Sequence, residues 1–176
     1  MRKVGEIKCP GLLLKDFSQE NLTNRYVSWL NDLDVVRYSR QRFSKHSLAS
    51  CEVFFKQMER SHEFFVAIYE IENGFRYIGN LTTITDERNQ VVDLAILLGE
   101  KGTWGQGYGQ VAWSGMMEFL LNIPDVRMVT GGCMADNTAM EKVMIKSGMK
   151  HYYTKKNYFI SDGGFCDSVH YFRENA

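Results

Sequence analysis

The chain has 176 residues, of which 44% are hydrophobic and 13% aromatic, and this composition can bury one sizeable core. Its 21 basic and 21 acidic residues balance, which excludes the net positive field that non-specific nucleic-acid binding depends on. Charges stand on both sides of the short apolar stretch near the N-terminus, a pattern typical of neither a signal peptide nor a membrane span. We therefore expect a single cytoplasmic domain over residues 1–176, with no nucleic-acid or membrane partner.

The N-terminal part of the sequence predicts one strand and two helices. The stretch GLLLKDF (residues 11–17) reads as the first strand, and Ser18 as the cap of a helix over Gln19 to Leu30. After Ser47, apolar residues recur at three- and four-residue spacing, which predicts a second amphipathic helix. A basic loop separates the two helices.

The middle of the sequence predicts antiparallel strands followed by a strand, loop and helix. Two apolar runs joined around Asn73-Gly74 indicate a hairpin. Val91 to Leu98 is expected to form a further antiparallel strand. A glycine-rich loop and an apolar helical stripe come next, and another strand is expected from Val126.

The C-terminal part predicts a short helix and a second hairpin. Asp136 or Asn137 caps the helix, and Ser147-Gly148 ends it. The hairpin is expected to turn at Asp162-Gly163-Gly164. Together these elements predict a mixed α+β domain with a mostly antiparallel sheet and a β-α-β-α unit near its end.

The four cysteines include no C-x-x-C pair, so neither a disulfide framework nor a zinc site is expected. They are Cys9, Cys51, Cys133 and Cys166. Cys133, in GGCMADN, is a candidate nucleophile, but no histidine is near it in the sequence. A buried structural thiol therefore explains Cys133 better.

The stretch WGQGYGQ (residues 104–110) places three alternate glycines just before a predicted helix. Glycine admits positive φ and lets a ligand approach backbone N–H groups, and at a helix start these groups form an anion site. The Gly-Lys-Ser/Thr of a P-loop is missing, and the third glycine is misplaced for a Rossmann fingerprint. The loop therefore predicts binding of a pyrophosphate or similar anion, with a flexible turn as the alternative.

The longer stretch LLGEKGTWGQGYGQVAW (residues 97–113) closely resembles the acetyl-CoA-binding motif of the GNAT acetyltransferase superfamily, especially its ribosomal-protein alanine N-acetyltransferase branch. DNTAMEKVMIKSGM (residues 136–149) resembles that family's second motif. The resemblance extends in order over nearly the whole chain. It implies an α+β GNAT-like fold, with a mostly antiparallel mixed sheet that splays between the fourth and fifth strands and is flanked by helices.

The resemblance also implies acetyl-CoA as co-substrate, without a metal. Backbone at Ile96 to Leu98 would bind the pantetheine arm and thioester, Gly105 to Gln110 the pyrophosphate, and Asn137 the pantetheine or amine side. The cofactor-binding residues expected on this basis are Ile96, Leu97, Leu98, Trp104, Gly105, Gln106, Gly107, Tyr108, Gly109, Gln110 and Asn137.

Direct acetyl transfer to a primary amine needs a neutral nitrogen, whereas an alkyl amine has a pKa near ~10.4 and is protonated at neutral pH. A base is therefore required. Asp93 is the best candidate, because it places a carboxylate in an apolar strand where related sequences often carry Glu. A strand-edge or salt-bridged Asp is an equally good explanation.

The general acid is harder to assign. Many GNAT enzymes use a Tyr in the second motif, where this chain has Met144, and the Ser of some relatives is Met140. Either the thiolate leaves without a dedicated acid, or another group serves. Tyr108, Tyr152 and Tyr153 are candidates, although packing explains each of them better.

The stretch RYSRQRFSKH (residues 37–46) concentrates basic side chains between the two early helices, on what the resemblance implies is the acceptor side. Arg40, Arg42 and His46 are the expected substrate-binding residues, because arginine binds phosphate bidentately. A solvated basic face is the simpler alternative.

The surrounding residues 26–48 resemble GNAT members of bacterial surface-polysaccharide synthesis. This resemblance favours a nucleotide-linked amino sugar as acceptor. A ribosomal-protein N-terminus, a polyamine or antibiotic amine, and a catalytically silent acetyl-CoA-binding module are the alternatives. A polyamine would call for an acidic pocket. The oligomeric state is left open, with a homodimer among the options.

Overall fold

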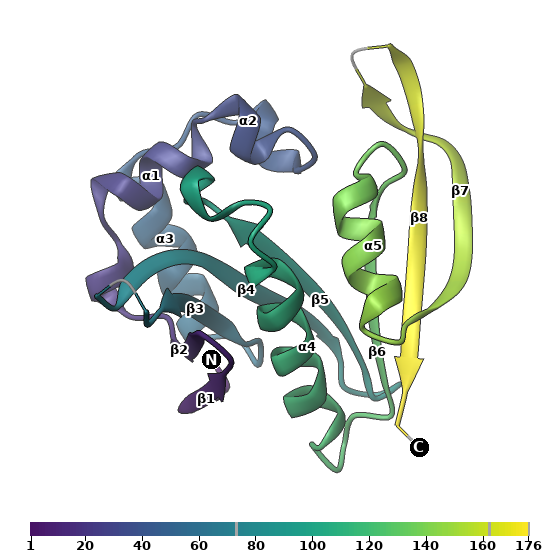
Figure 1. Cartoon of the computed structure of the whole chain (residues 1–176), viewed down its shortest axis with the longest axis horizontal. Helices are drawn as coiled ribbons and strands as arrows, with labels where there is room; N and C mark the ends of the chain where they lie inside the picture. Colours follow the sequence, from purple (N-terminus) through teal and green to yellow (C-terminus); the bar gives the residue numbers. More distant parts are fainter. Residues whose placement is uncertain (73, 162, 176) are drawn as a thin grey trace.

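The computed structural model describes residues 1–72, 74–161 and 163–175, which form a mixed eight-stranded sheet in the order β1-β2-β3-β4-β5-β6-β8-β7 (Figure 1). The strands are β1 (Glu6–Cys9), β2 (Leu12–Asp16), β3 (Phe65–Glu70), β4 (Arg76–Asp86), β5 (Val91–Leu98), β6 (Met128–Met134), β7 (Lys150–Ser161) and β8 (Gly164–Glu174). The helices are α1 (Asn24–Leu30), α2 (Leu33–Val36), α3 (Leu48–Glu59), α4 (Tyr108–Leu121) and α5 (Thr138–Lys146), with short 3₁₀ helices η1 (Gln19–Asn21), η2 (Arg40–Phe43) and η3 (Lys101–Thr103).

The predicted first helix is wrong over its first turn. Ser18 precedes the 3₁₀ helix η1, and α1 begins only at Asn24, where the Thr23 side chain accepts the Tyr26 N–H. The buried Asn21 explains the break: its Oδ1 accepts the Ser18 N–H, and its Nδ2 donates to the Tyr69 hydroxyl on β3 at 2.6 Å. These side-chain bonds fix a turn against the sheet and compete with a continuous helix.

One strand was missed, and the others were confirmed. The missed strand β1 pairs antiparallel with β2 across a turn in which Gly11 has a φ of 70°. Strand β5 has the predicted bounds, and Ser47 and Asn137 cap α3 and α5 as expected. Both predicted hairpins form, although their turn residues 73 and 162 lie outside the described residues.

Helices cover both faces of the sheet and create two cores. On one face, α4 buries Trp113, Met116 and Leu120 against the sheet, and α5 adds Met144. On the other face, α1 and α3 enclose a second cluster in which the Phe17 and Phe65 rings stack 3.9 Å apart. Each fully buried side chain of this size contributes about 1.5–3 kcal/mol. The sheet is therefore held rigidly from both sides.

The sheet opens between β5 and β6, the one parallel pair of neighbouring strands among the described residues. Val91–Asp93 of β5 pair with Met128–Thr130 of β6, and beyond these residues the two strands diverge (Figure 1). These are the fourth and fifth strands of the prediction, because the missed β1 precedes them. The predicted splay is confirmed, and it divides the sheet into a closed end and an open end.

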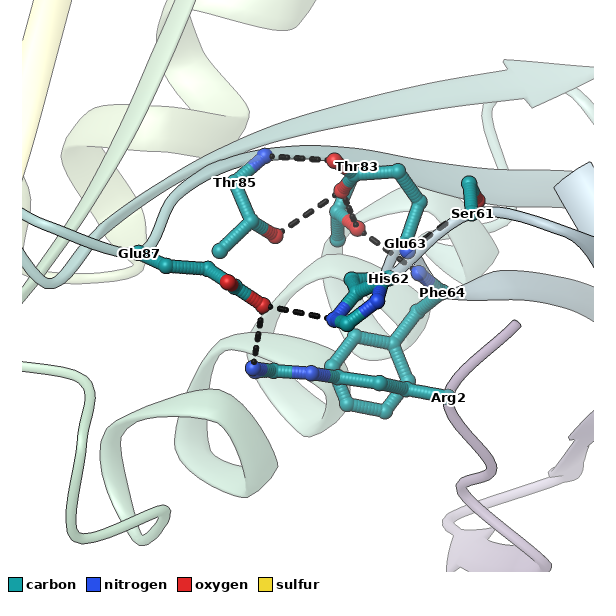
Figure 2. Close-up of polar contacts among 8 residues, drawn as sticks. All are labelled: Arg2, Ser61, His62, Glu63, Phe64, Thr83, Thr85 and Glu87. Carbon is teal, nitrogen blue, oxygen red and sulfur yellow. Dashed lines mark hydrogen bonds and ion pairs between the residues drawn. The ribbon is translucent and has the colours of Figure 1, made fainter.

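At the closed end, two carboxylates join separate segments (Figure 2). Glu63 accepts hydrogen bonds from the hydroxyls of Thr83 and Thr85, each at 2.8 Å, and from the Thr85 N–H at 2.9 Å. Glu87 contacts the Arg2 guanidinium at 3.1 Å and the His62 ring at 2.9 Å. These contacts connect the N-terminal segment and the loop before β3 to β4.

The cysteines are unpaired, and Cys51, Cys133 and Cys166 are buried. Burial, followed by the nearby Glu141 and Cys166, raises the pKa of the Cys133 thiol to about 12, which argues against a nucleophile there. Among the described residues there is no group of three or more His, Cys, Asp or Glu side chains placed to hold a metal ion. Over the same residues, no helix has the length and apolar character to cross a membrane.

Candidate active site

The glycine loop before α4 is bent so that its backbone faces open space. Gly105 and Gly107 have φ values of 77° and 84°, in the left-handed region that favours glycine. A Cβ added to either would meet no atom within 4 Å. Gly107 is the N-cap of α4, and no side chain caps this end. The first N–H groups of a 14-residue helix are therefore available to an anion.

The side chains of the loop are bound to the protein itself. The Trp104 Nε1 donates to the Leu98 carbonyl at 3.0 Å, and the Gln106 Nε2 donates to the Gly102 carbonyl at 2.7 Å. The Tyr108 hydroxyl donates to the buried Glu70 carboxylate at 2.9 Å. These residues thus fix the loop shape, which leaves the backbone to bind a ligand.

Gln110 connects the two helices next to the gap. Its Nε2 donates to the hydroxyls of Ser114 and Ser147 at 3.0 and 2.6 Å, which joins the first turn of α4 to the end of α5. Its Oε1 is buried without a partner among the described residues. Gly109 packs closely on β5, because a Cβ there would lie 3.3 Å from the Leu98 side chain.

The open edge of β5 supplies backbone groups to the gap. Ile96 to Leu98 pair with Leu81 to Gly79 of β4 on one side. On the other side, β6 pairs with β5 only as far as Asp93 within the described chain. Unpaired strand N–H and C=O groups need partners. An extended ligand lying between the strands would provide them.

Asp93 occupies the last paired position of β5, opposite Thr130. Its neighbours Val92 and Leu94 belong to the core under α4, so Asp93 faces the other side of the sheet. One carboxylate oxygen, Oδ1, is buried and has no hydrogen-bond partner among the described residues. Burial raises the pKa of the Asp93 carboxyl, and a hydrogen bond with Thr130 opposes this shift. The salt-bridged explanation therefore has no support in the described part of the structure.

These features fit a coenzyme with a pyrophosphate and an extended arm, and sequence and structure comparisons agree. The family model "Acetyltransferase (GNAT) domain" matches residues 12–150. The chain belongs to the GNAT acetyltransferase family. Its members are N-acetyltransferases that use acetyl-CoA as the acetyl donor.

Solved structures show the same fold at low sequence identity. One is RimL, a ribosomal L7/L12 alpha-N-protein acetyltransferase in complex with coenzyme A, with 14% identity, TM-score 0.82, and coverage of 97% of this chain and 98% of that one. A spermidine N-acetyltransferase from Vibrio cholerae, with CoA and spermine, has 13% identity, TM-score 0.81, and coverage of 94% and 96%. The microcin C7 self immunity acetyltransferase MccE, with acetyl-CoA and AMP, has 13% identity, TM-score 0.79, and coverage of 93% and 92%. None of the curated protein sequences matches the chain.

The second GNAT motif has a structural role in this chain. The Asn137 Oδ1 accepts the Met140 N–H at 3.2 Å and caps α5. Met144 is fully buried, so it belongs to the core, and its thioether has no acidic proton to give. Tyr152 and Tyr153, on the edge strand β7, pack against the rings of Phe172 and His170 as expected, although 51% and 40% of their surface is exposed.

Arg42, one of the predicted substrate residues, is bound to the protein instead of being free. Its guanidinium donates to the carbonyl oxygens of Arg37 at 3.0 Å and Ile160 at 2.7 Å. It also lies 3.2 Å from the Met134 sulfur at the end of β6. Arg42 thus joins the basic loop to β7 across the open end of the sheet.

The other two predicted substrate residues lie in the same region. An Arg40 guanidinium nitrogen is 3.4 Å from the Tyr158 hydroxyl on β7, and Arg40 is exposed. The His46 backbone bonds the Asn31 side chain through both its N–H and its carbonyl. The His46 Nε2 is buried without a partner among the described residues. The structure therefore places Arg40 nearest to solvent.

Two hollows flank the basic loop. One, of about 450 Å³, is lined by Arg40, Arg42, Phe43, Tyr158, Phe159 and Ile160. The other, of about 420 Å³, is lined by Leu30, Asn31, Leu33, Val36, Gln41, Arg42, Ser44 and Lys45. In Figure 1 the α1–α2 region lies at the end of the sheet where β5 and β6 diverge, and β7 ends and β8 begins at that same end. Both hollows therefore lie in the region that the family resemblance implies is the acceptor side.

Sequence reasoning missed the residues that support the site. Glu70, which holds Tyr108, reads as an ordinary strand residue, and Ser147 was recognised only as the end of a helix. The signal for Glu70 was a charge within the apolar run FVAIYE. His170, on β8, gave no signal in the sequence, because its neighbours follow from strand register alone.

Proposed function

We propose that this GNAT enzyme acetylates the primary amine of a nucleotide-linked amino sugar by direct transfer from acetyl-CoA, and that it does so in the cytoplasm. The hollow between η2 and β7 carries the proposal, because it combines the Arg40 guanidinium with the exposed rings of Phe43 and Tyr158. A guanidinium suits phosphate, and aromatic rings suit a nucleobase. Acceptor recognition is assigned here to Arg40, with Arg42 holding the wall of the hollow.

Asp93 is the proposed base. The acceptor enters as an ammonium with a pKa of about 10.4, so one proton must leave before the nitrogen can attack. The raised pKa of the buried Asp93 carboxyl brings it closer to the range suited to proton transfer at neutral pH. Backbone N–H groups of Ile96 to Leu98 would stabilise charge on the thioester oxygen. The N–C bond then forms and the C–S bond breaks.

The neighbouring structures support two acceptor classes. MccE was solved with acetyl-CoA and AMP, which favours a nucleotide-bearing acceptor. RimL acts on a ribosomal protein N-terminus, and this is the alternative acceptor. A polyamine, as in the spermidine enzyme, is disfavoured because Arg37, Arg40 and Lys45 make the loop basic.

Thiol release from acetyl-CoA tests the proposal. The purified protein is offered UDP-linked amino sugars, N-terminal peptides and polyamines at equal concentrations, and we expect turnover with a nucleotide sugar. Arg40→Gln should raise the KM for that sugar about tenfold or more, the equivalent of one lost charged contact of ~1.4 kcal/mol or more. Arg60→Gln, at the exposed end of α3, is the matched control.

The results of this assay distinguish between the possible acceptors. Turnover of N-terminal peptides alone would assign the ribosomal function instead. Tight acetyl-CoA binding with no turnover on any amine would favour the catalytically silent module, which is motivated by Met144 and Met140 at the positions of the family's Tyr and Ser.

A further inference from the structure

One face of the sheet brings Asp93 and His170 to the same region, although they are 77 positions apart by number. A Cβ on Gly131 would meet Trp113 of α4, so Gly131 faces the helices and Gly132 faces the other side. A Cβ on Gly132 would lie 2.6 Å from the His170 Nδ1, so the imidazole lies over Gly132. Asp93 faces that same side.

The strand register places His170 beside the beginning of the gap. Pairing between β5 and β6 ends at Asp93 and Thr130, and Gly132 is the next β6 residue on this face. His170 is the direct cross-strand partner of Gly132. Asp93 therefore lies at the last position where β5 pairs with β6. His170 lies beside Gly132, the first residue of β6 on this face that has no partner on β5 among the described residues.

The imidazole is held in one orientation. Its Nε2 lies 2.8 Å from the hydroxyl of the buried Ser168, and its ring stacks on Tyr153 with centroids 4.3 Å apart and planes 12° apart. Within the described chain no residue hydrogen-bonds its Nδ1. A ring fixed at one nitrogen and free at the other is suited to exchanging a proton with a ligand.

The charged and titratable groups around His170 are few. Tyr153 and Lys155 face it from β7, Asp93 is the acid on the same face of β5, and the neighbouring β6 positions on this face, Thr130, Gly132 and Met134, do not titrate. The Arg42 guanidinium contacts Met134 at the open end. Burial, followed by Lys155, holds the pKa of His170 below its usual value, so the ring is neutral at pH 7.

We propose that His170, oriented by Ser168 and Tyr153, is a second proton-transfer residue of the acetyl transfer. The proposal rests on the proposed function of Asp93 as the first base. An ammonium acceptor loses two protons on becoming an amide. Asp93 takes the first before attack. His170 takes the second from the nitrogen as the N–C bond forms, and gives it to the sulfur as the C–S bond breaks, so the thiol leaves neutral and His170 regains its neutral form.

This assignment supplies the acid that the second motif lacks. The position of the usual Tyr is the buried Met144. His170 reaches the same gap from β8, on the side away from α5. Gly132 is required in this arrangement, because any side chain there would occupy the space of the ring.

The test compares His170→Gln with His151→Gln, an exposed histidine on β7 that bonds Thr154. We expect His170→Gln to lower kcat about 10²-fold or more, with an unchanged dissociation constant for acetyl-CoA. The wild-type kcat should fall as the pH drops through the His170 pKa, below 6.5, and this fall should disappear in the variant. His151→Gln should change neither.

Two further variants keep the test independent of folding defects. In His170→Ala, added imidazole should restore part of kcat, which a merely structural role would not allow. Ser168→Ala should displace the acidic limb of the pH profile. A His170→Gln enzyme within twofold of wild type from pH 6 to 9 would overturn the proposal.

The acceptor does not affect this test, because proton loss is common to all amines. If the amino-sugar proposal fails and a peptide or polyamine is the substrate, the same variants are measured with that amine. If the amino sugar turns over and His170→Gln is unaffected, only the present proposal fails.

Discussion

The closed and open ends of the sheet treat their polar groups in opposite ways. At the closed end, Glu63 accepts three hydrogen bonds and Glu87 contacts two cationic or titratable partners (Figure 2). At the open end, the Asp93 Oδ1 and Gln110 Oε1 are buried without partners in the described structure. Burying an unsatisfied polar atom costs about 1–3 kcal/mol.

This contrast indicates that the fold loses some stability at the open end of the sheet, where the reaction is proposed to take place. The carboxylates at the closed end join segments and stabilise the domain, whereas the buried Asp93 Oδ1 has no protein partner in the described structure and belongs to the proposed base. Substitutions at the two ends should therefore have opposite effects on stability and activity. Replacing a polar residue at the closed end should lower stability and leave activity unchanged. Replacing one at the open end should lower activity without lowering stability.

The largest expected effect comes from Asp93→Asn. Removing the proposed base should lower kcat by about 10²- to 10⁴-fold while acetyl-CoA binding is kept. Steady-state kinetics and calorimetric titration of acetyl-CoA measure the two quantities. Asp86→Asn, an exposed acid at the end of β4, is the control and should leave kcat unchanged. Equal kcat values for Asp93→Asn and wild type would remove Asp93 from the mechanism.

The same variant should alter the pH dependence of stability. Because burial raises the folded-state pKa of Asp93, the native chain holds this proton more tightly than the unfolded chain does. Its contribution is full below the unfolded-state value near ~3.9 and is lost as the pH rises through the folded-state pKa. The free energy of unfolding of Asp93→Asn should therefore rise relative to that of wild type as the pH increases from about 3.9 through the folded-state pKa, as urea denaturation would measure.

The next effect concerns the glycine loop. Gly107→Ala should weaken acetyl-CoA binding about tenfold, the equivalent of ~1.4 kcal/mol, because its new Cβ would project into the space left for the anion. Gly74→Ala is a close control, since its φ of 87° is nearly that of Gly107 and its Cβ position is equally open. Both should lose roughly 1–2 kcal/mol of stability to left-handed strain. If Gly74→Ala weakens binding as much, the loop has no special role.

The sequence predicted the elements whose signals are local. Strand β5 has the predicted bounds because its run of apolar residues is interrupted only by Asp93, and α3 begins after Ser47 because that side chain and Ser50 form a capping box. The Asn137 cap is likewise formed within four residues. Each of these structures is decided by neighbours in the chain, which a single sequence displays.

The sequence could not predict features that depend on distant partners. The helix break at Asn21 follows from a bond to Tyr69, and the Arg42 guanidinium is bound to a carbonyl 118 positions away. The sequence shows which kind of side chain stands at each position, but it does not show which distant group that side chain will contact. The position of His170 required the register of β6 against β8, including which residues of each strand face the helices.

The smallest expected effect comes from a substitution at the closed end of the sheet. Glu63→Gln keeps the size of the side chain but replaces charged hydrogen bonds to Thr83 and Thr85 with neutral ones, so the free energy of unfolding should fall by about 1 kcal/mol. Glu59→Gln, exposed at the end of α3, should cost nothing measurable. Urea denaturation measures both, and kcat should be unchanged in each. A Glu63→Gln enzyme that keeps its stability but loses activity would mean that the closed end also serves the reaction, and the division between the two ends would fail.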